Sequence, residues 1–311
     1  MTAPALDGFL LRHAPQVPLP VDAALLRARR SLNGALATLD DVSDAALEGG
    51  WPWRGGEADV RYGFYRQFEA LQEARAAIRP KLTDAWPGEP PARPLVASAT
   101  SARWALHGLL AGLTDEELDL DPGNSEWTLR QTLAHIVGTQ RGYGWFSCWW
   151  LAQRDLQGEA FPSRVPEELA ELMPEDETEG AGTREDIRRR LDDILDLSGG
   201  ALAGLDDEAL AQRARWSGMP VSIGFRIGRW SSHIREHTVQ LEKTLDMLGR
   251  RPSEVQRLLR LLGEAYGRLE EDLFMWPADA RPTEALAITV KASDRLAEDA
   301  DTIRKAASRP R

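Results

Sequence analysis

The chain has 311 residues, of which 42% are hydrophobic and 28% are charged, so it is long enough and apolar enough to form two ordinary domains. Its formal net charge of −11 argues against nucleic-acid partners and against binding to an anionic membrane surface, because both require a basic patch. No segment approaches the roughly 20 apolar residues of a membrane span and the N-terminus lacks a signal-peptide pattern, so we expect a cytoplasmic protein without a membrane partner.

Helical spacing dominates the chain, and strand signals are nearly absent. Ala, Leu, Arg and Glu recur at the helical period, while no stretch shows a sustained alternation of β-branched residues. The sequence therefore predicts an all-α fold with enough helices for two four-helix bundles. The helices are expected near residues 21–39, 57–79, 97–113, 128–155, 184–204, 221–249, 253–275 and 283–307.

Several helix ends have a chemical cause. Thr128 followed by Gln131, and Ser253 followed by Gln256, fit the capping box, in which a hydroxyl and an amide satisfy free backbone N–H groups. The proline-rich segment 87–94 is expected to be non-helical and places a domain boundary near residue 95. Residues 157–182 are rich in Pro, Gly and Glu, which predicts a long mobile connection that borders the site.

Two parts of the chain look like copies of each other. The run Leu-Ala-Thr-Leu-Asp-Asp at 36–41 parallels Leu-Ala-Gly-Leu-Thr-Asp at 110–115, and each is followed by a Trp before a long helix. This pattern predicts that residues 21–79 are a diverged copy of 97–155. Short similarities also arise by chance in helices rich in Ala and Leu, which is the alternative.

The predicted duplication defines two domains. The first copy has aromatic residues and Arg61 in the segment 60–65 where the second copy has His135, so the first is expected to be metal-free. The C-terminal helices would complete that first bundle. The predicted domains are a discontinuous metal-free bundle, 1–95 plus 252–311, and a metal-binding four-helix bundle, 96–251. Such a chain would be a monomeric pseudo-dimer, with a homodimer as the alternative.

Three histidines are the candidate metal ligands. His233 and His237 are four residues apart, so in a helix their imidazoles project from one face and could share a cation. His135 lies in an apolar run, where a neutral imidazole needs a partner to offset its desolvation. Spacing alone leaves the ordinary alternative open, since histidine pairs of this kind also occur on solvated helices. Cys148 is the only cysteine, which excludes a thiolate metal cluster.

The surroundings of these histidines resemble a known family. Trp127 is followed by a capping Thr and, eight residues after the Trp, by His135, and residues 229–240 read Arg-Trp-Ser-Ser-His-Ile-Arg-Glu-His-Thr-Val-Gln. Over residues 97–249 the chain is similar to the DinB/YfiT-like family. The resemblance implies a four-helix bundle that holds a divalent metal ion, zinc or nickel, through His135, His233 and His237.

Neighbouring polar residues are expected to support the site. Gln240 lies one turn beyond His237 and would orient a ligand or a bound water. Glu236 is turned about 100° from His237 in a helix, so a solvated position or an interhelical salt bridge is favoured for it, with a general base as the alternative. Gln140 and Arg141 follow His135 and would line the entrance.

The resemblance also suggests an activity, because the family includes bacillithiol transferases and mycothiol-dependent maleylpyruvate isomerases. It implies a metal-dependent thiol transferase in detoxification or the stress response, with a low-molecular-weight thiol cosubstrate and a small-molecule substrate. One alternative is a metal-dependent hydrolase that uses bound water. The other is a non-catalytic, stress-associated metal-binding protein, in which the metal serves folding.

Overall fold

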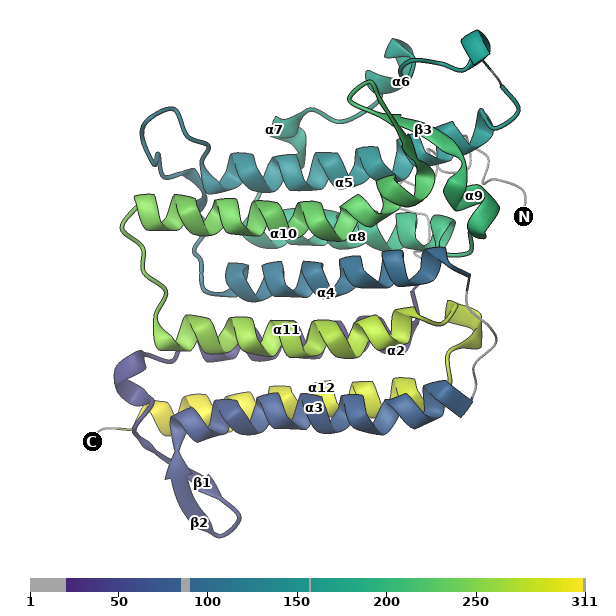
Figure 1. Ribbon diagram of the computed structural model, residues 1–311. Helices are drawn as coiled ribbons and strands as arrows, with labels where there is room; N and C mark the ends of the chain where they lie inside the picture. Colours follow the sequence, from purple (N-terminus) through teal and green to yellow (C-terminus); the bar gives the residue numbers. More distant parts are fainter. Residues whose placement is uncertain (1–20, 85–89, 157, 310–311) are drawn as a thin grey trace. The chain divides into compact units, whose positions relative to one another are not determined.

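The computed structural model describes residues 21–84, 90–156 and 158–309, and over this part the chain is mostly helical, as predicted (Figure 1). These residues form two compact units. Unit 1 contains residues 90–103 and 114–249, and unit 2 contains residues 21–84, 104–113 and 250–309. None of the helices in the described ranges is both long and apolar enough to cross a membrane.

Unit 1 is built around helix α5 (Leu129–Ala152), which packs against α8 (Arg184–Leu202) and α10 (Ile223–Met247). The first half of α4 (Ala92–Ala111) belongs to this bundle and is joined to α8 by a buried ion pair, with 2.9 Å between Nη1 of Arg103 and Oδ1 of Asp196. Fully buried side chains such as Ile136, Trp230 and Ile234 form the core. The shorter elements are η2 (Glu116–Asp119), η3 (Gly158–Ala160), α6 (Glu167–Ala170), α7 (Asp176–Glu179), α9 (Asp207–Ala211), β3 (Arg213–Trp216) and β4 (Met219–Ser222).

Unit 2 is a second helical bundle, in which α12 (Thr283–Ala307) packs against α2 (Ala23–Asp40) and α3 (Val60–Asp84). Helix α11 (Glu254–Phe274) also contacts α2 and α3. The second half of α4 belongs here, where α4 and α11 approach so closely that a Cβ added at Gly263 would lie 2.7 Å from the carbonyl oxygen of Trp104. The remaining elements are η1 (Asp44–Ala46), β1 (Gly50–Trp53), β2 (Gly56–Asp59) and η4 (Ala278–Ala280).

Helix boundaries follow the capping chemistry in most places. Both predicted capping boxes are present, at Thr128 before α5 and at Ser253 before α11. The expectation that the whole segment 87–94 is non-helical is wrong for its last three residues, because α4 begins at Ala92. Pro94 is the third residue of this helix, where its missing N–H has no partner within the helix to lose.

Two β-hairpins depart from the all-α expectation, one before α3 and one before α10. Strands β1 and β2 pair antiparallel, as do β3 and β4, each pair closing on a two-residue turn. The turn residues Arg54 and Gly55 have φ of 46° and 79°, and Ser217 and Gly218 have φ of 49° and 80°. Positive φ at both central residues gives the turn whose twist matches a hairpin.

The hairpins also correct the predicted repeat. Trp53 pairs with Gly56 in the first hairpin, and Trp216 pairs with Met219 in the second, 163 positions later. The helices that follow, α3 and α10, begin at Val60 and Ile223, which are also 163 positions apart. No hairpin precedes α5 in the described chain. The predicted pairing of 21–79 with 97–155 is therefore wrong, and residues 21–79 repeat residues 184–242 instead.

The other helices of unit 2 complete the correspondence in a permuted order. The buried positions of α12 repeat those of α5 at a constant separation of 153: Ala285, Thr289, Ser293, Leu296 and Ala300 match Thr132, Ile136, Gln140, Tyr143 and Ser147. In unit 2 a buried pair joins Glu270 of α11 to Arg29 of α2, with N–O distances of 2.6 and 3.0 Å. In unit 1 the arginine of the corresponding pair lies on α4 and the acidic residue on α8, so the charges are exchanged between the two helices. Thus α11, α12, α2 and α3 correspond to α4, α5, α8 and α10.

Candidate metal centre

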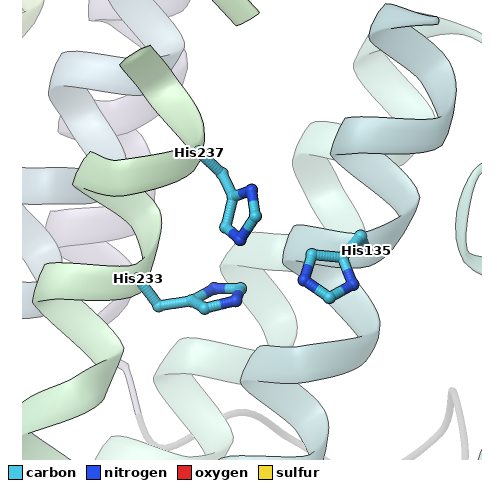
Figure 2. A group of neighbouring side chains, drawn as sticks. All are labelled: His135, His233 and His237. Atoms are coloured by element: carbon cyan, nitrogen blue, oxygen red, sulfur yellow. The ribbon is translucent and has the colours of Figure 1, made fainter. Parts of the chain in front are cut away.

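Three imidazoles converge between α5 and α10 of unit 1 (Figure 2). His135 lies near the start of α5, while His233 and His237 project from successive turns of α10. One nitrogen from each ring lies within 4.8 Å of the other two. Within the described ranges this is the one group of histidine, cysteine or carboxylate side chains close enough to hold a metal ion.

The geometry fits a small divalent ion. Imidazole nitrogens bind zinc at about 2.0–2.1 Å, so two ligands of one ion lie at most about 4 Å apart. The three nitrogens lie within 4.8 Å of one another, so a bound ion requires them to move closer by less than about 1 Å. The donor set contains nitrogen alone, which suits zinc and other borderline transition metals better than magnesium or calcium.

Burial keeps the imidazoles of His135 and His233 neutral. His233 is only 5% exposed, and its burial, reinforced by the neighbouring His237 and His135, lowers its pKa to about 3. Burial and His237 also lower the pKa of His135, while the nearby Asp176 opposes the shift. Both side chains are therefore uncharged near pH 7, with a lone pair available for a ligand bond.

Two glutamines contact the histidines of α10. Oε1 of Gln240 lies 2.7 Å from Nδ1 of His237, so Nδ1–H donates to it and Nε2 is left for a ligand. Gln140 of α5 lies against His233, with 3.3 Å between its Nε2 and Nδ1 of the ring. Sequence reasoning placed Gln140 only at an entrance. The structure buries it completely.

Glu236 is occupied by a salt bridge. Its carboxylate accepts two hydrogen bonds of 2.7 Å from Arg229, and this arginine holds the pKa of Glu236 below its usual value. Unit 2 repeats the arrangement 163 positions earlier, with Arg66 bonded to Glu73. In both units the arginine also lies over the Trp of its hairpin, Trp216 or Trp53. These contacts favour the salt-bridge alternative over a general base.

A small cavity lies next to His135. It has a volume of about 260 Å³ and is lined by Trp127, Gln131 and Asp176, among others. Trp127 is 39% exposed, and its ring centroid lies 5.1 Å from that of His135. Asp176 belongs to α7, so the connection between α5 and α8 does border the histidines. Trp127 therefore both lines the cavity and contacts His135.

That connection is fixed to α5 by a buried ion pair. Arg141, one of the residues expected at an entrance, donates instead to the carboxylate of Glu179, with 3.0 Å between Nη2 and Oε2. Glu179 is 1% exposed and belongs to α7. Arg141 therefore holds α7 beside the histidines.

Residues 98–241 match the model of a family described as the DinB superfamily. This segment of the chain belongs to the DinB superfamily. The DinB segment contains all three histidines and both glutamines, and it includes the β3–β4 hairpin. The superfamily is typically metal-binding. No curated protein and no solved structure matched the chain.

Proposed function

We propose that His135, His233 and His237 bind one divalent metal ion, zinc or nickel, and that unit 1 is a metal-dependent thiol transferase. The observation that carries the proposal is the convergence of three imidazoles, two of which are kept neutral by burial. A neutral imidazole binds a cation without first losing a proton, so His135 and His233 can each bind a metal directly at neutral pH.

Three protein ligands are the number found in catalytic metal sites. Structural zinc sites use four protein ligands, whereas catalytic sites use three and leave a position for water or substrate. The group at α5 and α10 offers three donors, and a cavity adjoins it at Trp127. The donor count and the cavity together support a catalytic role.

The proposed chemistry is the activation of a thiol. A divalent metal at this site would lower the pKa of a small thiol and so supply a thiolate nucleophile at neutral pH. The chain's residues would provide orientation: Gln240 fixes the ring of His237, and the indole of Trp127 forms a wall against which an electrophilic substrate can pack. The thiol proton would pass to solvent. The thiolate sulfur would then form a bond to the electrophilic carbon as a halide departs, as an epoxide C–O bond opens, or as the electrons of a conjugated double bond shift to the carbonyl oxygen.

The test is conjugation by the zinc- or nickel-loaded protein. A panel of small thiols that includes bacillithiol and mycothiol is combined with alkyl halides, epoxides and unsaturated ketones, and the thioether product is measured by mass spectrometry. We expect product with the loaded wild type and a loss of at least about 100-fold, the scale of one catalytic group, with His135→Ala. Glu236→Gln serves as the matched control and should retain activity. Failure of every thiol and electrophile pair would overturn the transferase proposal.

The same assay separates the two alternatives. Turnover of ester or epoxide substrates without added thiol would identify a hydrolase. A protein that melts on chelation and turns over no substrate would have a structural site. The salt bridge that occupies Glu236 weighs against a hydrolase in which this carboxylate is the general base.

A further inference from the structure

We propose that Gln140 is a positioning residue for the metal site: its Oε1 accepts a hydrogen bond from Nδ1–H of His233 and thereby presents Nε2 of that ring to the metal. The inference deepens the proposed function, since it rests on His233 being a metal ligand. It assigns a partner to the most buried of the three histidines.

The contact between Gln140 and His233 is buried. Gln140 is 0% exposed and His233 is 5% exposed, so water does not compete for the hydrogen bond between them. The ring of Tyr143, one turn further along α5, packs edge-on against His233 with 5.7 Å between centroids. These neighbours restrict rotation of the imidazole and leave the amide end of Gln140 as its polar partner.

The chemistry of imidazole decides which end of the amide faces the ring. A neutral imidazole carries one N–H, so if Nε2 binds a metal then Nδ1 must carry the hydrogen and needs an acceptor. The structure places Nε2 of Gln140 at 3.3 Å from Nδ1 and leaves Oε1 buried without a hydrogen bond. Turning the amide by 180° brings Oε1 to Nδ1–H with almost no change in shape.

His237 provides the precedent within the same site. Its Nδ1 already faces an amide oxygen, Oε1 of Gln240, at 2.7 Å. With Gln140 turned as proposed, both histidines of α10 donate Nδ1–H to a glutamine oxygen. Both would then direct Nε2 towards His135.

Unit 2 gives an independent observation, because it lacks the ligands and the glutamines together. Ala70 and Ala74 stand where unit 1 has His233 and His237, and Ala77 stands where it has Gln240. At the position of Gln140, α12 has Ser293, whose buried hydroxyl has no hydrogen-bond partner. The Arg–Glu pair and the hairpin Trp are kept in both units. Gln140 is therefore present only in the unit that has the histidines, whereas the scaffold residues are common to both units.

The experiment compares Gln140→Leu with Gln140→Glu. Leu removes the acceptor at similar volume, whereas Glu keeps an oxygen for Nδ1–H and has no N–H to donate. Zinc affinity is measured by competition with a chromophoric chelator at pH 7.5. We expect a loss of about 10- to 100-fold for Leu and near wild-type affinity for Glu. Gln67→Leu is the matched control, because Gln67 is an equally buried glutamine of unit 2, and it should leave zinc affinity unchanged.

A second measurement does not depend on metal binding. Long-range ¹H–¹⁵N spectra of the histidine-labelled, metal-free protein report which ring nitrogen of His233 carries the hydrogen. We expect the Nδ1–H form in the wild type and a shift towards a mixture in Gln140→Leu. An Nε2–H form in the wild type, or wild-type zinc affinity in Gln140→Leu, would overturn the proposal. A wild type that binds no zinc would instead overturn the proposed function, while the spectra would still report the tautomer.

Discussion

Burial of His233 favours the neutral imidazole, which can bind a cation, but it also lowers the stability of the folded protein. Only 5% of the residue is exposed, so the charged imidazolium is disfavoured and its pKa falls to about 3. A neutral ring inside the bundle can bind a cation directly, but it also needs its hydrogen bonds made within the protein. The amide of Gln140 meets this need from a different helix, and the ring of Tyr143 packs edge-on beside it.

The lowered pKa of His233 predicts a pH dependence of stability for the metal-free protein. An unfolded chain binds a proton at His233 below about pH 6.5, whereas the folded protein does so only near pH 3. Between these values the unfolded state holds more protons, so the free energy of unfolding falls as the pH falls. Urea unfolding from pH 7.5 to 4.5 should show a steeper decline for the wild type than for His233→Ala. Equal slopes would contradict the assignment.

Substitution of Glu236 distinguishes a structural role of this residue from a catalytic one. Its side chain is 54% exposed, so removing the salt bridge to Arg229 should cost at most about 1 kcal/mol. We expect Glu236→Gln to retain its zinc content and to lower turnover no more than a few-fold. A pH–rate profile that loses its acidic limb in this variant would instead identify Glu236 as the base.

How far the sequence predicts the site depends on the kind of contact. The pairing of His233 with His237 follows from helix geometry, because residues four apart share a face. That His135 completes the set with them could be predicted only from the resemblance to the DinB/YfiT-like family. The contact between Gln140 and His233 joins side chains 93 positions apart, and no local pattern carries that information.

At the scale of elements, long helices were predictable and the hairpins were not. The long helices have the expected apolar period, and Thr128 and Ser253 cap theirs as expected. Each strand of the hairpins has four residues, too short for alternation to be recognised. The signal lay in the turns, where Arg54-Gly55 and Ser217-Gly218 adopt positive φ.

The two turns predict a matched pair of destabilised variants. Gly55 and Gly218 have φ of 79° and 80°, and an added Cβ would meet nothing within 4 Å at either position. Backbone strain alone therefore sets the cost, and Gly55→Ala and Gly218→Ala should each lose about 1–2 kcal/mol in urea unfolding. Gly34→Ala is the control, because Gly34 lies in the middle of α2 with free space around its Cα. That change should stabilise by about 0.5–1 kcal/mol, and a loss there, or no loss at the turns, would contradict this explanation.

For the whole molecule, the chain contains a permuted second bundle without the metal ligands. The sequence indicated a duplication but aligned it wrongly, because runs rich in Leu and Ala match in several registers. The constant separation of 163 positions through hairpin and helix fixes the register. The second bundle thus acts as an internal comparison: Trp, Arg and Glu common to both bundles belong to the scaffold, and residues present only in unit 1 belong to the site.

This comparison predicts where metal binding alters the protein. Hydrogen exchange with and without zinc should slow in α5 and α10, which provide the ligands. The corresponding helices α12 and α3 have Ile288 and Ala70 at the matching positions, so they should exchange at unchanged rates. Zinc-dependent protection of α3 and α12 in place of α5 and α10 would contradict the assignment of the site to unit 1.

The central claim is that three histidines of unit 1 hold one metal ion, and metal content tests it most directly. Elemental analysis of purified wild type should give about one zinc or nickel ion per chain, the content expected of a single three-histidine site. The double variant His233→Ala, His237→Ala should contain almost none, while Glu236→Gln on the same helix should match the wild type. Equal metal content in the double variant and the wild type would contradict the account.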